Sequence, residues 1–311
     1  MNNTQYELII IGGGPAGVAA GVYAARKRIK TLLLTYSFES QSVVSEKIEN
    51  WIGTVAISGS DFAKNMEAHL RAYAGESVEI KTGDKVKTLR RIEGGFEVEM
   101  EKGEKFTTKT TLITSGSVRR KLDAKGADIY EHKGLTYCAT CDGPLYDGQD
   151  VLVIGGGNAA FETTAQLAAY CKSVTIINRG DAFRADPVTV EKVLAKPNVT
   201  AIKNAISLEV KGDKFVNGFV YKDANTGEEK TLDVSGIFVE IGLIANTEYA
   251  AGVVDRNPVG QIIVNPRTQE SSVKGIWSAG DCTDGLYHQN NIAAGDAVKA
   301  LEDIYNYLHT K

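Results

Sequence analysis

The two residues with the clearest capacity for chemistry are Cys138 and Cys141, which are separated by two residues in the chain. Thiols at this spacing can hold a zinc ion, close a structural disulfide or act as a reversible redox pair. A structural zinc site needs four ligands. The other two cysteines, Cys171 and Cys282, are isolated, and none of the four histidines has zinc-finger spacing to the pair. The redox interpretation is therefore favoured, and we expect no metal site.

The pair precedes the second copy of an internal repeat. Residues 7–34 and 150–177 each contain an apolar strand, a glycine-rich turn, an amphipathic helix and a second apolar strand. An offset of 143 residues relates the copies without a gap and places Gly12 at the position of Gly155. Two such βαβ units predict an α/β protein with two Rossmann-like, three-layer dinucleotide-binding domains.

The glycine-rich turns carry the chemical part of this prediction. In a dinucleotide-binding turn the first glycine permits the tight turn, the second lets a pyrophosphate approach the backbone, and the third lets helix and strand pack closely. The pyrophosphate then lies at the helix N-terminus, where free N–H groups and the helix dipole favour negative charge. The motif residues are Gly12, Gly14 and Gly17 in the first copy, and Gly155, Gly157 and Ala160 in the second.

The segments around the repeats are also patterned. Residues 94–116 show hairpin-like strand alternation, residues 216–242 resemble them, and the tail from residue 293 has helical spacing. No low-complexity linker is present, so any domain boundary must be short. The best candidates are residues 117–121 and 243–247.

Composition limits the class of protein. The chain has 311 residues, which predicts about two domains at roughly 100–200 residues each. The net charge of −4 argues against a nucleic-acid footprint or a polybasic membrane anchor. No apolar run reaches the roughly 18 residues of a membrane span, and the N-terminus lacks the basic region of a signal peptide. We therefore expect a cytoplasmic protein with neither a nucleic-acid nor a membrane partner.

Taken together, these motifs resemble the low-molecular-weight thioredoxin reductases and the closely similar reductase portion of the alkyl hydroperoxide reductase flavoprotein. The resemblance covers essentially the whole chain, and YCATCDGPLY (137–146) is its most specific motif. The other matching segments are IIIGGGPAG (9–17), IENWIG (48–53), LITSGSVRRKL (112–122), VIGGGNAAFE (153–162), GIFVEIGLIANTE (236–248) and GIWSAGDCTD (275–284).

The resemblance implies a discontinuous layout. An FAD-binding domain would comprise residues 1–117 and 248–311, and a pyridine-nucleotide domain carrying the cysteine pair would comprise residues 118–247. It also implies a homodimer, and a domain rotation that alternately brings nicotinamide and the cysteine pair to the flavin. The implied activity is the reduction of thioredoxin, or a similar small disulfide protein, by NAD(P)H through FAD.

The resemblance also implies the flavin-binding residues. Asp281 would contact the polyol chain or the pyrophosphate region, and Gln289 would lie near the isoalloxazine. For His288, a role at the flavin and an ordinary hydrogen-bonding role are equally expected. The full implied set is Gly12, Gly14, Pro15, Ala16, Gly17, Gln41, Asn50, Thr114, Gly116, Gly280, Asp281, His288 and Gln289.

The nucleotide donor is less clearly specified. Family members that use NADPH carry a His-Arg-Arg-x-x-x-Arg pattern here, whereas this chain has Asn178 and Gly180 in place of the histidine and the second arginine. A 2′-phosphate needs cationic donors, but the acid that would select NADH is also absent. NADPH is favoured, and NADH or a reduced ferredoxin remain alternatives. The implied nucleotide-binding set is Gly155, Gly157, Asn158, Ala159, Ala160, Arg179 and Arg184.

For the cysteine pair, the resemblance implies distinct roles. Cys141 would be the flavin-proximal sulfur, Cys138 would attack the partner's disulfide, and Asp142 would manage protons on the thiolate. Asp142 could instead be a turn or N-cap carboxylate before the Gly-Pro dipeptide. We expect Cys171 and Cys282 to be packed thiols without a chemical role.

Other functions remain open. One is a reductase for another disulfide partner, such as a peroxiredoxin-linked, glutaredoxin-like protein. The chain lacks the extra N-terminal domains of the hydroperoxide-reductase branch, which favours a free thioredoxin as partner. A second alternative is a flavin- or nucleotide-binding sensor without enzymatic activity, and the intact Cys-x-x-Cys-Asp motif argues against it.

Overall fold

The computed structural model describes residues 6–45 and 47–310. These residues form two compact units. The chain builds the first unit up to Val118, passes through the second unit from Arg119 to Leu243, and completes the first from Ile244 onward. The predicted α/β architecture, with one Rossmann-like domain inserted in another, is confirmed. Residues 1–5 of the N-terminal segment lie outside the described residues, and its strand begins at Tyr6.

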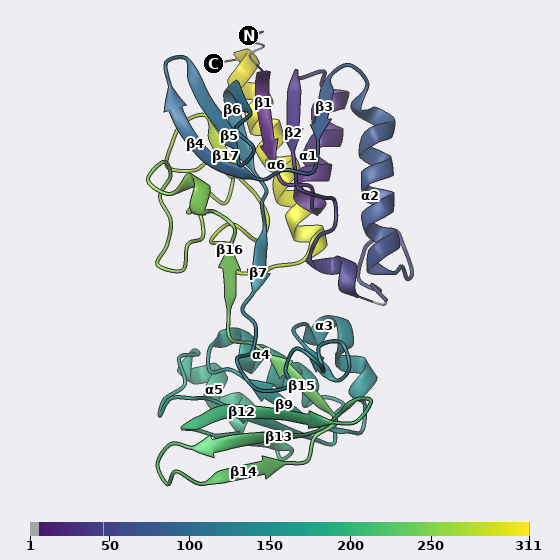
Figure 1. Ribbon diagram of the computed structural model, residues 1–311, viewed down its shortest axis with the longest axis vertical. Coiled ribbons are helices and arrows are strands. Elements are labelled where there is room, and N and C mark those ends of the chain that lie inside the picture. The colour runs from purple at the N-terminus through teal and green to yellow at the C-terminus, as the bar shows by residue number, and fades with distance from the viewer. Residues whose placement is uncertain (1–5, 46, 311) are drawn as a thin grey trace. The chain divides into compact units, whose positions relative to one another are not determined.

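The first unit contains a mostly parallel sheet. Its strands are β1 (Tyr6–Ile11), β2 (Thr31–Leu34), β3 (Val78–Lys81), β4 (Val86–Ile92), β5 (Gly95–Met100), β6 (Lys105–Ile113) and β17 (Ile276–Ser278). The order is β3-β2-β1-β6-β5-β4, and β17 pairs with the second half of β6 (Figure 1). The hairpin of β4 and β5 is antiparallel, whereas β1, β2, β3, β17 and β6 run parallel.

The central strand of this sheet is buried on both faces. Along β1, Leu8 and Ile10 belong to the cluster that packs against the helices, and Ile9 and Ile11 belong to the cluster on the opposite face. This alternation follows from the two-residue period of a strand. A continuous run of apolar residues is therefore needed at β1, as expected for a parallel strand covered on both sides.

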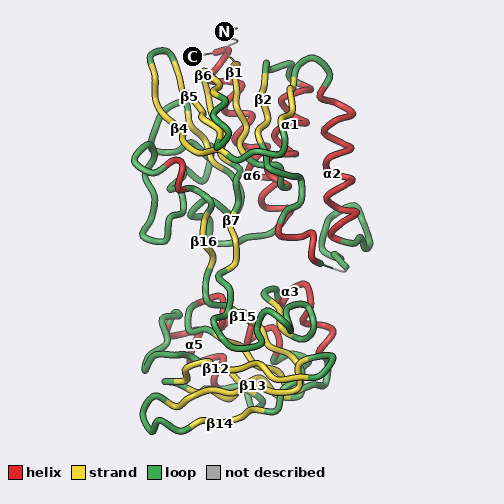
Figure 2. Tube along the Cα trace, viewed as in Figure 1, coloured by secondary structure: helices red, strands yellow, loops and turns green. Residues whose placement is uncertain are grey.

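Helices α1 (Pro15–Arg26), α2 (Gly59–Ala74) and α6 (Asn290–Thr310) cover one face of the sheet (Figure 2). Two short 3₁₀ turns, η1 (Gln41–Val44) and η3 (Glu248–Ala250), lie in the same unit. The side chain of Ser58 caps α2 by accepting a hydrogen bond from the N–H of Asp61 at 3.1 Å. Fully buried alanines in α1 and α6 let these two helices approach closely.

The second unit contains a parallel sheet of five strands in the order β11-β10-β9-β15-β8. Its helices α4 and α5 follow β9 and β10, and a short helix α3 follows β8 (Figure 1). The bounds are β8 (Leu135–Thr136), α3 (Ala139–Asp142), η2 (Gly143–Tyr146), β9 (Asp150–Ile154), α4 (Asn158–Leu167), β10 (Ser173–Ile177), α5 (Pro187–Leu194), β11 (Val199–Ile202) and β15 (Gly236–Val239).

An antiparallel sheet forms the third layer of this unit. Its strands are β12 (Ala205–Gly212), β13 (Val216–Asp223) and β14 (Glu229–Leu232). In β9, Leu152 and Ile154 pack with Phe219 from this antiparallel layer, while Val151 and Val153 pack with Phe161 of α4. The parallel sheet is thus enclosed between helices and a second sheet.

The secondary structure predicted for both repeats is confirmed, because strand, turn, helix and strand recur at β1-α1-β2 and β9-α4-β10. The hairpin predicted within residues 94–116 is β5–β6, and the predicted terminal helix is α6. The similar prediction for residues 216–242 is only partly right. Strands β13 and β14 pair antiparallel, but β15 joins the parallel sheet beside β9. All four residues of β15 are buried, which suits a central parallel strand.

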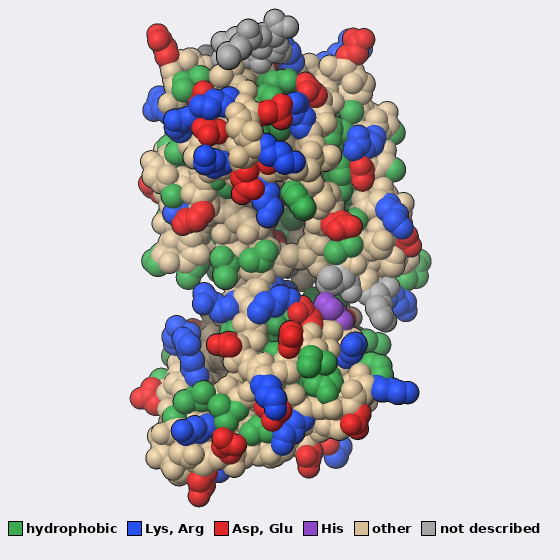
Figure 3. Space-filling model, in the orientation of Figure 1, with side chains coloured by type: hydrophobic (Ala, Val, Ile, Leu, Met, Phe, Trp, Pro, Cys, Tyr) green, Lys and Arg blue, Asp and Glu red, His purple; other side chains and the backbone are tan. Residues whose placement is uncertain are grey.

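The chain crosses between the units at two short strands. These are β7 (Ser117–Arg119) and β16 (Leu243–Ala245), which pair with each other in a two-stranded sheet. On the face seen in Figure 3, acidic and basic side chains are interspersed over each unit. Among the described helices, none has the length and apolar character needed to cross a bilayer.

Trp277 fixes the terminal helix to the sheet. Its side chain is fully buried, and its indole N–H donates a 3.0 Å hydrogen bond to Asp303 of α6. We predict that Trp277→Phe lowers the free energy of unfolding by about 2–4 kcal/mol, because it leaves a cavity and an unpaired acceptor. Urea titration followed by far-UV circular dichroism, at saturating FAD, measures this change.

The other tryptophan provides a matched control. Trp51 is only partly buried and contacts Phe62 edge-on at a centroid distance of 5.0 Å. Trp51→Phe should change the unfolding free energy by less than about 1 kcal/mol, because an aromatic ring is kept at a partly solvated position. Equal losses in the two variants would contradict the anchoring role of Trp277.

Candidate active site

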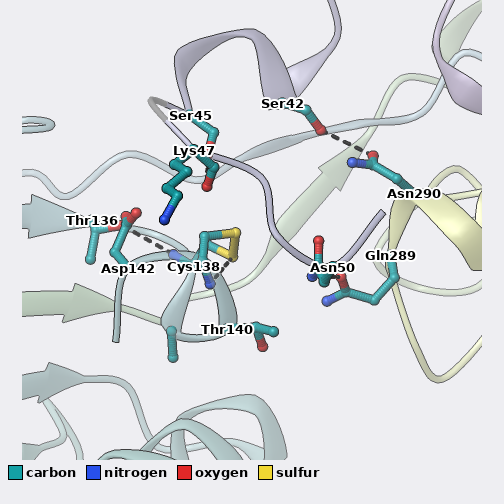
Figure 4. Close-up of a disulfide and its surroundings, with 12 residues drawn as sticks. Ser42, Ser45, Lys47, Asn50, Thr136, Cys138, Thr140, Asp142, Gln289 and Asn290 are labelled. Carbon is teal, nitrogen blue, oxygen red and sulfur yellow. Dashed lines mark hydrogen bonds between the residues drawn. A yellow bond between two sulfur atoms is a disulfide. The ribbon is translucent and has the colours of Figure 1, made fainter. Parts of the chain in front are cut away.

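Cys138 and Cys141 form a disulfide at the start of α3 (Figure 4). Cys138 is the N-cap residue of this helix, and its Sγ accepts a 3.2 Å hydrogen bond from the backbone N–H of Cys141. Cys138 is partly buried and Cys141 is exposed. An N–H aimed at Sγ stabilises negative charge there, so this contact favours the thiolate of Cys138 once the bond is reduced.

Asp142 is oriented by Thr136. The hydroxyl of Thr136 donates a hydrogen bond to Oδ2 of Asp142 and accepts one from the backbone N–H of Cys138 at 3.3 Å (Figure 4). The Asp142 side chain does not cap the following 3₁₀ turn. Its carboxylate is therefore held beside the disulfide by β8, which is the geometry needed for proton exchange with a sulfur.

The short helix that carries the disulfide is tied to α4. The side-chain amide of Gln166 donates a 3.2 Å hydrogen bond to the carbonyl of Ala139, and the hydroxyl of Thr140 lies 3.5 Å from Oε1 of Gln166. The redox pair and the glycine turn that precedes α4 thus belong to one packed arrangement within the second unit.

The first glycine turn has the geometry of a dinucleotide cradle. A Cβ on Gly12 would lie 2.3 Å from the carbonyl oxygen of Thr114, and one on Gly17 would lie 1.8 Å from the carbonyl oxygen of Gly12. The protein's own packing therefore requires glycine at both positions. At Gly14 the nearest atom to a Cβ would be 3.7 Å away, so packing alone does not require glycine there. Close approach of a ligand would.

The helix that follows this turn has no side-chain cap. Gly14 is the N-cap of α1 and Pro15 opens the helix, whereas α2 and α5 are capped by Ser58 and Asp186. The N-terminal N–H groups of α1 are thus left without a side-chain acceptor, as anion binding at this position requires.

The remaining candidate flavin residues converge on the same edge of the first unit. Asp281 lies 3.4 Å from both the side-chain amide of Gln41 and Nδ1 of His288. Gly280 would place a Cβ 3.3 Å from that of Ala16 on α1. The two amide side chains predicted to line the flavin, Asn50 and Gln289, are joined by a 3.1 Å hydrogen bond (Figure 4).

The loop after β6 completes this edge. The hydroxyl of Thr114 donates to the carbonyl of Ile11, and Gly116 has a positive φ of 64°. The carbonyl of Gly116 accepts a 3.0 Å hydrogen bond from the N–H of Asn246. All candidate residues of the first unit are therefore brought together at the carboxyl ends of β1 and β6, where α/β folds bind ligands.

The second glycine turn repeats the first. A Cβ on Gly155 would lie 2.3 Å from the carbonyl oxygen of Glu240, while Gly157 has no atom within 4 Å of that position. Ala160 is fully buried and Ala159 is exposed. Gly157 is the N-cap of α4 and supplies no side-chain cap.

Asn158 has a structural role in the loop after β10. Its Oδ1 accepts a 2.8 Å hydrogen bond from the N–H of Asp186, and Gly156 accepts one from Arg184 at 2.6 Å. Asn178 donates its side-chain amide to the carbonyls of Gly180 and Ala182. The loop that would meet the adenosine ribose is therefore held against the glycine turn by polar contacts.

Three cations lie on or next to this loop. Arg179 and Arg184 are exposed and have no ion-pair partner among the described residues. Lys203, which was not predicted, stands in the next loop, whose Asn204 N–H bonds to the carbonyl of Gly180 at 3.0 Å. Its Nζ lies 5.3 Å from the ring centroid of Phe183. A surface hollow of about 360 Å³ is lined by Ala182, Phe183, Ala185, Pro187, Val190, Glu191 and Lys203.

Glu240 is a second residue that was not predicted. It directly follows β15, and burial raises the pKa of its carboxyl to about 7 despite the nearby guanidinium of Arg119. Its motif, GIFVEIG, was noted as a segment, but its burial depends on α4 and β7 folding against it. An acid among apolar residues at a strand end is the one local signal that could have drawn attention to it.

The remaining cysteines are packed, as predicted. Cys171 and Cys282 are buried and unpaired. Burial raises the pKa of the Cys171 thiol to about 11 and also raises that of Cys282. Both thiols are therefore protonated near neutral pH and unreactive. Across the described ranges, no group of three or more His, Cys, Asp or Glu side chains could hold a metal ion.

These two cradles and the disulfide agree with comparisons to known proteins. A Pseudomonas aeruginosa protein whose name places it in alkyl hydroperoxide reductase is 38% identical over 304 residues, which cover 97% of this chain and 58% of that protein. A protein named NADH dehydrogenase from Bacillus subtilis (strain 168) is 38% identical over 303 residues, with the same coverage of 97% and 58%. The chain thus spans less than two thirds of the length of these relatives.

A solved structure is similar over nearly the whole of both chains. The thioredoxin reductase from Giardia duodenalis has a TM-score of 0.90 at 30% identity, covering 98% of this chain and 99% of that one. The family model for pyridine nucleotide-disulphide oxidoreductases matches residues 6–297. The chain is therefore an oxidoreductase that belongs to the pyridine nucleotide-disulphide oxidoreductase family.

Proposed function

We propose that this protein is an FAD-dependent disulfide reductase, with a reduced nicotinamide dinucleotide as electron donor and thioredoxin, or a similar small disulfide protein, as acceptor. The observation that carries the proposal is the Cys138–Cys141 disulfide, which shares a unit with one uncapped glycine turn while a second turn of the same design lies in the other unit. A redox disulfide with two dinucleotide cradles suits this reaction.

The residues of the first unit fit FAD. The open position at Gly14 and the uncapped N-terminus of α1 would hold the pyrophosphate, and Asp281 would bind a ribityl or ribose hydroxyl. Asn50 and Gln289 would supply amide groups to the polar edge of the flavin. When bound, FAD supplies the two-electron chemistry that connects a hydride donor with a disulfide.

The residues around the disulfide can carry out the exchange with the partner. In the reduced pair, the Cys138 thiolate attacks a sulfur of the partner's disulfide, which forms a mixed disulfide and releases one partner thiolate. The Cys141 thiolate then attacks Sγ of Cys138, which restores the intramolecular disulfide and releases the second partner thiolate. Asp142, held by Thr136, supplies a proton to a leaving sulfur.

NADPH is the donor that the charges favour. Arg179, Arg184 and Lys203 surround the loop from Asn178 to Arg184, and a 2′-phosphate needs such cationic donors. Lys203 would replace the cation that is missing at Gly180. NADH is the alternative, and it is favoured by the name of the Bacillus subtilis relative.

Replacement of the attacking sulfur separates the two halves of the reaction. We predict that Cys138→Ser retains bleaching of the flavin by NADPH under anaerobic conditions, because the nucleotide and flavin cradles are unchanged. Turnover with thioredoxin should fall by about 10³-fold or more, because an alcohol replaces the nucleophilic thiolate. Insulin reduction in the presence of thioredoxin measures the second quantity.

Cys282→Ser is the matched control, because this thiol is fully buried and separate from the disulfide. It should retain both activities to within about threefold if the protein folds normally. Thioredoxin turnover that persists in Cys138→Ser would refute the assigned nucleophile.

Asp142 can be tested through its hydrogen-bond partner as well as directly. We predict that Asp142→Asn lowers disulfide turnover by about 10²-fold, because the asparagine amide cannot supply a proton. Thr136→Val should lower it by about 3- to 10-fold, because the carboxylate loses its orienting donor. Flavin reduction by the nucleotide, followed in a stopped-flow instrument, should be unchanged in both variants. A loss confined to that half-reaction would contradict the role of Asp142.

The donor proposal makes a separate prediction about Lys203. Lys203→Ala should raise the KM for NADPH by about 3- to 10-fold and change the KM for NADH by less than about twofold, because only the 2′-phosphate needs the cation. Steady-state kinetics with both donors measures the ratio. Lys214→Ala, which removes an equally exposed charge at a distant turn, is the control. Equal effects of Lys203→Ala on both donors would exclude 2′-phosphate recognition.

A further inference from the structure

Glu240 occupies a special position in the parallel sheet of the second unit. The chain leaves β9 through α4 towards β10 and β11 on one side, while β15 and β8 lie on the other side of β9. This arrangement makes the gap between β9 and β15 the topological switch point, outside whose carboxyl ends a ligand binds. Glu240 directly follows β15, and its N–H bonds to the carbonyl of Ile154 at 2.8 Å. Glu240 and the glycine turn therefore form the two sides of this crevice.

The carboxyl of Glu240 has few partners for a charged group. Its Oε1 accepts a 3.1 Å hydrogen bond from Thr163 of α4, and its Oε2 lies 3.6 Å from a guanidinium nitrogen of Arg119 on β7. The side chain is 11% exposed. The third group that acts on it is the carboxylate of Glu162 on α4, which repels negative charge. Burial outweighs the attraction of Arg119, so the neutral and charged forms both occur near pH 7.

The first unit shows that the fold does not need an acid here. Thr114 holds the equivalent position after β6, because its carbonyl oxygen lies 2.3 Å from a Cβ placed on Gly12, as that of Glu240 does for Gly155. The Thr114 hydroxyl is neutral and donates to the backbone at Ile11. A neutral residue therefore satisfies the same corner in one unit, and a titratable residue was placed there in the other.

We propose that Glu240 is a positioning residue that takes up a proton when the nicotinamide dinucleotide binds to the second unit. This inference rests on the proposed use of such a donor. The pyrophosphate carries two negative charges, and the cradle at Gly157 places it beside the carboxyl ends of β9 and β15. A charged Glu240 would repel it across a crevice of low polarity, whereas a protonated Glu240 removes the repulsion and can donate a hydrogen bond.

The direction of the pH dependence follows from this linkage. The carboxyl binds its proton more tightly in the complex than in the free protein, so nucleotide affinity is highest at low pH and falls as pH rises above 7. If the complex raises the proton affinity of the carboxyl about tenfold, the affinity falls about fivefold between pH 6.5 and pH 8.5. Under the same condition, about half a proton is taken up per nucleotide bound at pH 7.5.

Calorimetric titration of the oxidised FAD-loaded protein with NAD⁺ and with NADP⁺ tests the proposal. Titrations at pH 7.5 in buffers of different ionisation enthalpy give the number of protons taken up. NAD⁺ lacks the titrating 2′-phosphate, so its uptake reports on the protein alone. Glu240→Gln, which keeps the shape but is always neutral, should take up less than about 0.1 proton and bind with an affinity that varies less than about twofold with pH.

Glu162→Gln is the matched control, because it removes an exposed carboxylate from the same helix face without touching the crevice acid. It should keep proton uptake close to that of the wild-type protein. Equal uptake in Glu240→Gln and wild type would overturn the assignment to Glu240. Wild-type uptake below about 0.1 proton would overturn the proposal without any variant. Failure of both nucleotides to bind wild type at every pH would instead overturn the proposed donor, and the inference with it.

Discussion

The close approach of two backbones at each switch point is the constraint on which both units depend. A Cβ on Gly12 or Gly155 would lie 2.3 Å from a carbonyl oxygen of the neighbouring strand's end, at Thr114 or Glu240. Any side chain at either glycine would push the two strands apart and close the path from strand to helix. Because the strands meet this tightly, the following helix starts with unpaired N–H groups directed at the crevice. The anion site is therefore a consequence of the packing, and the second glycine of each turn keeps it open.

In the second unit the same constraint also places the redox chemistry. Helix α4 begins at the glycine turn, and Gln166 on that helix holds the carbonyl of Ala139 in the short helix of the disulfide. Strand β8, at the edge of the same sheet, ends at Thr136, which orients Asp142. The nucleotide cradle, the disulfide and its acid are thus fixed to one sheet and one helix. A displacement of α4 would disturb all three, which explains why no flexible linker separates them.

Local pattern was sufficient to predict much of this. The glycine spacings between an apolar strand and an amphipathic helix predicted both cradles, because each glycine is needed for contacts within about 30 residues of its βαβ unit. The departure of β15 from the expected hairpin could not be predicted in this way, since its partner β9 lies far away in sequence. Glu240 and Lys203 were missed for the same reason. The contact of Glu240 with Thr163 spans 77 residues, and Lys203 meets the nucleotide loop only through pairing of adjacent loops.

The difference between the two turns points to a difference in how their ligands are held. At the first turn the neutral hydroxyl of Thr114 is satisfied by the backbone of β1, and the surrounding side chains are joined to one another across distant segments, as Asn50 is to Gln289. Such a site has no titratable group at its switch point and suits a cofactor that stays bound. At the second turn a carboxyl that can be charged or neutral near pH 7 stands at the same corner. A ligand that binds and leaves in every cycle can exchange charge with such a group, whereas a permanently bound one would keep it in a single state. The asymmetry at this corner therefore matches the division into one retained and one exchanging nucleotide.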